Sequence, residues 1–226
     1  MRLLQTFSTS IGTKILIAVT GLGLTVFLLT HLAGNLLFLA GPDAFNRYAH
    51  TLTSNPLIYV AEAGLLAVFF VHIAKTLSNY LANRAARPVA YTTHRWAKTK
   101  NPASRKSWAS TTMVVTGSIM ALFVVTHLQT FKFGPVYEGA DGIRDLYRLQ
   151  MEIFGQPAYV VFYLMAMALI FSHLWHGIVS ATQSLGWYHP QWTPRVIVAG
   201  RVLTALIAGG FFMIPIYTFL LSRSAQ

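Results

Sequence analysis

The chain contains no cysteine and few acidic residues: six Asp and Glu stand against 17 Lys and Arg among 226 residues. Without thiols it can form no disulfide, hold no iron–sulfur cluster through cysteine, and attach no c-type haem, which needs a Cys-x-x-Cys-His motif. Only 10% of the residues are charged and 54% are hydrophobic, whereas soluble domains average about 25% charged residues. This composition favours an integral membrane protein, and any iron–sulfur chemistry must belong to a partner chain.

Five apolar runs are long enough to cross a bilayer, which takes about 20 mostly apolar residues. The predicted spans are Ile15–Ala40, Leu57–Leu77, Thr111–Phe131, Ala158–Ser180 and Val196–Leu221. The first run is too long to be the apolar part of a cleavable signal peptide. A shorter segment, Gly139–Phe154, is expected to form an interfacial helix. The sequence therefore predicts an all-α integral membrane protein with five transmembrane helices, as a single domain over residues 1–226.

The charges predict the orientation of these spans. The loop Leu81–Ala109 holds seven Lys and Arg and no acid, and short loops rich in Lys and Arg stay in the cytoplasm. We therefore expect a multi-pass protein of the cell inner membrane, with a cytoplasmic N-terminus and the C-terminus outside. The net charge of +11 follows from this asymmetry. No phosphate-binding glycine loop or nucleic-acid-binding module is visible, so no nucleic-acid partner is expected.

One pattern occurs twice within the spans: Val-Thr-Gly, eight further residues, then Thr-His-Leu. The copies are Val19–Leu32 and Val115–Leu128, and seven of their fourteen positions are identical. A histidine inside a lipid-embedded helix is costly unless something uses it. Two matching helices that each carry one suggest a shared ligand, and haem is the ligand that we favour. Gly21 and Gly117 leave room for a flat macrocycle or, equally well, for a neighbouring helix.

Histidines lie in four of the five predicted spans. They are His31, His72, His127, His173 and His176. At the rise of a helix, His31 and His127 lie about 25 and 30 Å from the inner ends of their spans, in the outer half of the membrane. His72 and His173 lie about 18 and 21 Å from the inner ends, and His176 about 16 Å. The depths therefore sort into an outer pair and an inner pair.

Paired imidazoles on facing helices suggest two six-coordinate haem irons inside a four-helix bundle. No axial position would then remain for oxygen. A local match between Ala67–Ile73 and Ala168–Leu174 favours His173 as the partner of His72, whereas depth slightly favours His176. The main rivals are simple hydrogen bonds between helices and a zinc site or proton pathway. Zinc usually recruits carboxylates or thiolates, which makes that reading weaker.

Over nearly its whole length the chain resembles the membrane anchor of succinate:quinone oxidoreductases and quinol:fumarate reductases, in the single-chain, two-haem cytochrome b type. Four sequence features carry the resemblance. They are Thr20-Gly21 eleven and ten residues before His31, Thr116-Gly117 likewise before His127, the basic loop after His72, and His173 with Gly177, Gly186 and Trp187 behind it. The spacing of the last group looks like the haem-binding pattern of the family and selects His173 over His176.

The resemblance implies that the first four helices form a bundle that binds two haem b groups. His72 and His173 would be the axial iron ligands of the proximal haem, nearer the cytoplasm, with His176 as the alternative to His173. His31 and His127 would hold the distal haem, nearer the outer face. These residues are the expected metal and cofactor ligands.

The same resemblance implies partners. An FAD-containing flavoprotein subunit would interconvert succinate and fumarate, and an iron–sulfur subunit would relay electrons to the proximal haem. Both would dock on the cytoplasmic side, over the basic loop. The anchor would carry no dicarboxylate site but would exchange electrons with a membrane quinone, usually menaquinone in the two-haem type.

Glu62 is the expected proton carrier for the quinone, because quinone reduction takes up protons and Glu62 is the only acid in any span. It lies about 15 Å outward of His72. The alternative is a structural role as partner of Arg47 or a hydroxyl. Some relatives carry a second functional Glu just before the fourth-span histidine. Here Ser172 occupies that place, so a proton route there is not expected.

Two other functions stay open on the sequence. One is a cytochrome b anchor of another membrane dehydrogenase, such as a hydrogenase or formate dehydrogenase, whose soluble partner would lie outside. The other is a haem-free transporter that uses the histidines for protons or a metal ion.

Overall fold

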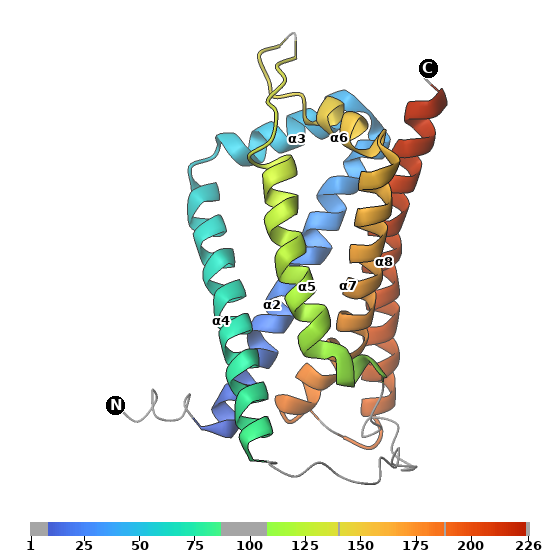
Figure 1. Ribbon diagram of the computed structural model, residues 1–226. Helices are drawn as coiled ribbons and strands as arrows, with labels where there is room; N and C mark the ends of the chain where they lie inside the picture. Colours follow the sequence, from blue (N-terminus) through green and yellow to red (C-terminus); the bar gives the residue numbers. More distant parts are fainter. Residues whose placement is uncertain (1–8, 87–107, 140, 188, 225–226) are drawn as a thin grey trace. The chain divides into compact units, whose positions relative to one another are not determined.

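The computed structural model describes residues 9–86, 108–139, 141–187 and 189–224. Of these residues 86% are helical, and they include no β-strand. Five helices are long and apolar enough to cross a membrane. They are α2 (Ser10–Leu36), α4 (Leu57–Ala85), α5 (Trp108–Phe131), α7 (Pro157–Ser184) and α8 (Thr193–Ser224) (Figure 1). The prediction of an all-α protein with five membrane-length helices is confirmed.

Several helices extend beyond the apolar runs that predicted them. Helix α2 begins five residues before the predicted start at Ile15, and α4 continues from Leu77 to Ala85. Apolar length marks only the part of a helix that lipid covers, whereas hydrogen bonding within the helix continues into polar sequence. The end of α4 carries Arg84 in its last turn, where a positive charge is favourable beside the helix C-terminus.

Short helices occupy the connections that precede α4 and α7. The 3₁₀ helix η1 (Leu37–Ala40) ends at Gly41, whose φ of 100° lies in the left-handed region that favours glycine. Helix α3 (Pro42–Ser54) follows, with proline in its first turn. No helix was predicted for this segment from the sequence, although proline after glycine is a usual helix-start signal.

The segment Gly139–Phe154, predicted to form an interfacial helix, contains a shorter helix. Helix α6 covers Leu146–Phe154 because Asp145 caps it, with an oxygen that accepts a hydrogen bond from the backbone N–H of Arg148 at 3.0 Å. Asn46 of α3 donates to the same carboxylate at 2.8 Å. Before the cap, the Tyr137 hydroxyl donates to Glu152, and this hydrogen bond raises the pKa of Tyr137.

The contacts divide the chain into two units, and all five long helices contribute to each. The first unit contains the described parts of Met1–Thr25, Leu65–Gly117 and Ser172–Thr204. The second contains those of Val26–Gly64, Ser118–Phe171 and Ala205–Gln226. The core of the second unit gathers side chains from α2, α6, α7 and α8. They are Leu32, Leu149, Ile153, Phe154, Val160, Tyr163 and Ile214.

Most of the basic loop falls at 87–107, outside the described residues. The orientation that its charges predict therefore stays a prediction. The structure supports the coarser statement, that five helices have the length and composition of a multi-pass membrane protein.

Candidate functional site

Each unit contains one pair of facing imidazole rings. In the first unit His72 of α4 faces His173 of α7, with ring centroids 6.5 Å apart and planes inclined at 68°. In the second unit His31 of α2 faces His127 of α5, with centroids 5.8 Å apart and planes at 88°. The helix depths predicted one inner and one outer pair, and the family pattern selected His173 as the partner of His72. Their role as iron ligands stays a prediction.

The spacing of each pair fits two imidazoles on opposite sides of one metal ion. A metal–imidazole bond is about 2 Å long, so two trans rings have centroids about 6 Å apart. A porphyrin would supply the other ligands of an iron, so two histidines would be enough to hold it. In the described part of the chain, no three His, Cys, Asp or Glu side chains gather into a metal-binding group.

The first pair sits against the Thr-Gly ends of the two repeats. Thr20 Oγ1 lies 3.1 Å from Nδ1 of His72, and Thr116 Oγ1 lies 3.2 Å from Nδ1 of His173. Both threonines are buried, with exposed fractions of 8% and 3%. The contact through Nδ1 leaves Nε2 of each ring as the atom available to a metal.

The glycines beside these threonines give the rings their room. A methyl group on Gly21 would lie 3.1 Å from Cε1 of His72, and one on Gly117 would lie 3.3 Å from Cε1 of His173. In the sequence, each Thr-Gly step stands eleven and ten residues before the histidine of its own repeat. In the structure, the step contacts a histidine of a different helix.

The second pair has a different environment. His127 Nδ1 lies 3.3 Å from the Tyr163 hydroxyl. The Asn35 amide lies 3.4 Å from His31 Nε2 and donates to the His31 carbonyl at 2.8 Å, while Phe27 stacks on the His31 ring at 5.3 Å. Asn35 and Phe27 stand four residues either side of His31, a spacing that brings helix side chains together. Tyr163 has no such local signal.

His173, and not the alternative His176, supplies the ring that packs against His72. His176 lies three residues further along α7 in the same unit. The geometry therefore favours the pair that the family pattern selected over the pair that depth alone slightly favoured.

Glu62 forms an ion pair with Lys132, the residue that follows the last residue of α5. Both side chains lie in the second unit, and they are 41% and 40% exposed. The partner is thus neither Arg47 nor a hydroxyl, the two structural partners that the sequence suggested. An exposed acid paired with a base can exchange protons with a molecule that reaches it from the membrane. The role of Glu62 as proton carrier stays a prediction.

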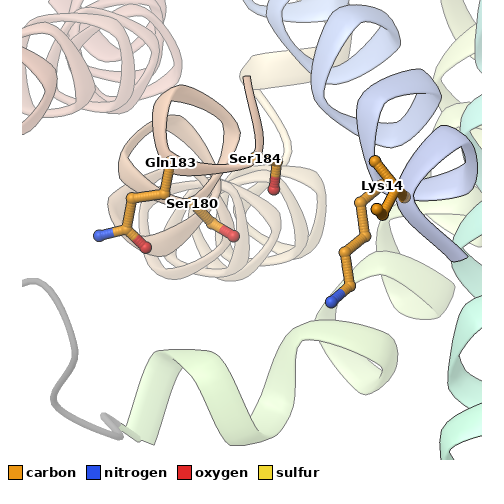
Figure 2. A pocket seen from close by; sticks show the side chains of 5 residues that line it. Lys14, Ser180, Gln183 and Ser184 are labelled. Carbon is orange, nitrogen blue, oxygen red and sulfur yellow. The ribbon is translucent and has the colours of Figure 1, made fainter. Parts of the chain in front are cut away.

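A separate open pocket of about 330 Å³ lies in the first unit between the start of α2 and the end of α7. Figure 2 shows its polar side chains, which are Lys14, Ser180, Gln183 and Ser184. Lys14 places a positive charge near the end of the α2 span, where membrane proteins commonly carry cations.

No protein-family model matches the chain, and no curated protein is significantly similar to it. What can be inferred about function therefore comes from the paired histidines and the residues around them.

Proposed function

We propose that the chain is the two-haem cytochrome b membrane anchor of a respiratory complex II, either a succinate:menaquinone oxidoreductase or a quinol:fumarate reductase. The observation that carries the proposal is the duplicated pairing of imidazoles. Two rings from two different helices face each other in each unit, at a spacing of about 6 Å that suits trans ligands of one iron.

Four histidines have distinct tasks in this proposal. His72 and His173 hold the haem nearer the cytoplasm, and His31 and His127 hold the second haem. Haem b supplies a one-electron carrier when bound. With two imidazoles to hold each haem, the iron would have no position left for oxygen, which would suit electron transfer rather than oxygen chemistry.

The partners of the proposed anchor come from its resemblance to the succinate:quinone oxidoreductase family. There an iron–sulfur subunit passes electrons to the anchor and receives them from an FAD-containing subunit that acts on succinate or fumarate, and this chain, which contains no cysteine, would hold no Cys-ligated cluster itself. The basic loop on the predicted cytoplasmic side supplies the docking face. The chain lies in the cytoplasmic membrane, with its N-terminus inside and its C-terminus outside.

The quinone reacts on this chain and takes protons from the Glu62–Lys132 pair. Lys132 compensates the charge of Glu62, so the pair can stay at the edge of the membrane without an isolated charge. Because both side chains are about two-fifths exposed, a membrane-dissolved menaquinone has access to them.

Haem content per chain, measured by pyridine haemochrome on the purified full-length protein, tests the proposal. We expect two b haems in the wild type and one in each of His31→Ala, His72→Ala and His173→Ala, because one axial ligand is lost. His176→Ala and the exposed His50→Ala are matched controls that should keep two. A colourless wild type would overturn the proposal and favour the transporter. Loss of haem in His176→Ala but not in His173→Ala would overturn the ligand assignment.

The identity of the partner is tested in native membranes. We expect the tagged chain to co-purify with bound flavin, with iron–sulfur signals, and with succinate-dependent reduction of a menaquinone analogue. Co-purification with a hydrogenase or formate dehydrogenase activity instead would identify a cytochrome b anchor of a different enzyme.

A further inference from the structure

The hydroxyl hydrogens of Thr20 and Thr116 are already committed within their own helices. Thr20 Oγ1 donates to the carbonyl of Leu16 at 2.6 Å. Thr116 Oγ1 lies 3.1 Å from the carbonyls of both Thr112 and Met113 and donates there. A threonine hydroxyl has one hydrogen to give. Towards the histidine, each threonine oxygen can therefore only accept.

This assigns the tautomer of both rings in the first pair. Nδ1 of His72 and Nδ1 of His173 must carry the hydrogen, because each faces an oxygen whose own hydrogen points elsewhere. In a neutral imidazole the other nitrogen, Nε2, then holds the lone pair. Both rings of the pair thus present a free lone pair, which is the form that binds iron.

The second pair has no equivalent threonines. Thr30 and Thr126 directly precede His31 and His127. Their hydroxyls donate to the carbonyls of Phe27 and Leu122 in their own helices, as those of Thr20 and Thr116 do, but these hydrogen bonds reach no histidine. The group near His127 Nδ1 is the Tyr163 hydroxyl. The two pairs therefore differ in their hydrogen-bonding surroundings, although the four histidines are of one type.

We propose that Thr20 and Thr116 are positioning residues that set the tautomer, orientation and donor strength of His72 and His173, and thereby lower the midpoint potential of the haem between them. The proposal rests on the proposed function. A histidine whose distal N–H donates to an oxygen is a more basic ligand, and a stronger donor favours the ferric state. The threonine oxygen accepts more strongly because its own hydrogen is given to a carbonyl.

The two ends of the repeat motif then have different roles. Its histidine end supplies one ligand of one pair, and its Thr-Gly end orients and accommodates a ligand of the other pair. Each of α2 and α5 thus contributes to both histidine pairs through residues eleven positions apart.

Redox titration of the visible absorbance, on the purified assembled enzyme, tests the proposal in Thr20→Val, Thr116→Val and the double variant. Valine keeps the shape of threonine and removes the acceptor. We expect the potential of one haem to rise in each variant, most in the double variant, and that of the other haem to stay unchanged. Thr20→Ser, which keeps the hydroxyl, should leave the potential at its wild-type value. Thr25→Val is the matched control, because the Thr25 hydroxyl bonds only to the carbonyl of Gly21 in its own helix.

Retention of haem gives a second readout. Removal of such outer hydrogen bonds typically weakens metal binding about 10–100-fold, so the valine variants should release one haem faster while Thr20→Ser and Thr25→Val do not. Unchanged potentials together with unchanged haem release in the double variant would overturn the proposal, as would an equal effect of Thr25→Val.

Failure of the proposed function is distinguishable from failure of this inference. A wild type without haem would overturn the proposed function. The tautomer of the histidines can then still be determined by ¹⁵N NMR of labelled histidine in the full-length protein. We expect the hydrogen of His72 on Nδ1, the atom that faces the Thr20 oxygen. A hydrogen on Nε2 of His72 in the wild type would overturn the tautomer assignment whether or not haem is bound.

Discussion

The sequence shows which charged residues lie in a predicted span, but it does not show which residue pairs with each of them. Glu62 was recognised as the only acid within a span, and its two suggested partners were Arg47 and a hydroxyl. The structure pairs it with Lys132, 70 residues further along the chain. The pair is partly exposed, and surface ion pairs of this kind contribute only about 0–1 kcal/mol to stability. Stability alone therefore explains little of why an acid lies there.

Replacement of Glu62 by Gln should slow quinone reduction without loss of haem. Removal of a general acid or base typically costs about 10²–10⁴-fold. In the assembled enzyme we expect succinate to reduce both haems as before, while turnover with a menaquinone analogue falls by that order. Glu138→Gln, which removes an acid from the same unit, is the control and should keep its turnover. Full quinone turnover in Glu62→Gln would exclude Glu62 as the proton carrier.

At the scale of the elements, two glycines of α2 show how closely helices approach. A methyl group on Gly21 would lie 3.1 Å from the His72 ring, whereas one on Gly23 would lie 3.9 Å from Val68, an ordinary van der Waals distance. Gly117 of α5 repeats the first situation against His173. Among these three glycines, only Gly21 and Gly117 lie where a methyl group would press on a histidine ring.

Gly21→Ala and Gly117→Ala should therefore displace a ligand ring, whereas Gly23→Ala should not. We expect each of the first two variants to lose or perturb one haem, seen as a lower haem content or a shifted Soret band. Gly23→Ala should keep both haems and gain up to about 1 kcal/mol of helix stability, because alanine is the better helix former. Equal haem loss in Gly23→Ala would show that the effect is general helix packing and not room for the ring.

At the scale of the whole molecule, each unit has its own histidine pair and every long helix takes part in both units. Four helices supply the paired histidines, and α8 supplies none. It contributes core packing instead, through Ile214 in the second unit and through the fully buried Thr204 in the first. This arrangement agrees with the sequence, in which the fifth span is the one without histidine.

The absence of cysteine makes the predicted orientation simple to test, because every introduced thiol is the only one in the chain. We expect Glu138→Cys to react with a membrane-impermeant thiol reagent added outside intact cells, since it lies in a predicted outer connection. Asn101→Cys, in the basic loop, should react only after the membrane is opened, because loops rich in Lys and Arg stay inside. The reverse pattern would invert the topology and with it the side on which partners dock.

The sequence by itself determined the class of protein, its five long helices and the sorting of the histidines into two pairs. These are properties of position along a single helix, since apolar length and rise per residue need no knowledge of neighbours. Helix α3 and the start of α6 were missed or misplaced because short helices depend on caps such as Asp145 and less on apolar length.

Only the tertiary structure decided which residues of different helices meet. The contacts of Thr20 with His72, of Thr116 with His173, of Tyr163 with His127 and of Lys132 with Glu62 depend on how each helix is rotated and which helix packs beside it. Those variables are set by the packing of all side chains together. The repeat by itself therefore does not show which histidine a Thr-Gly step contacts, because that histidine lies on a different helix and outside the repeat.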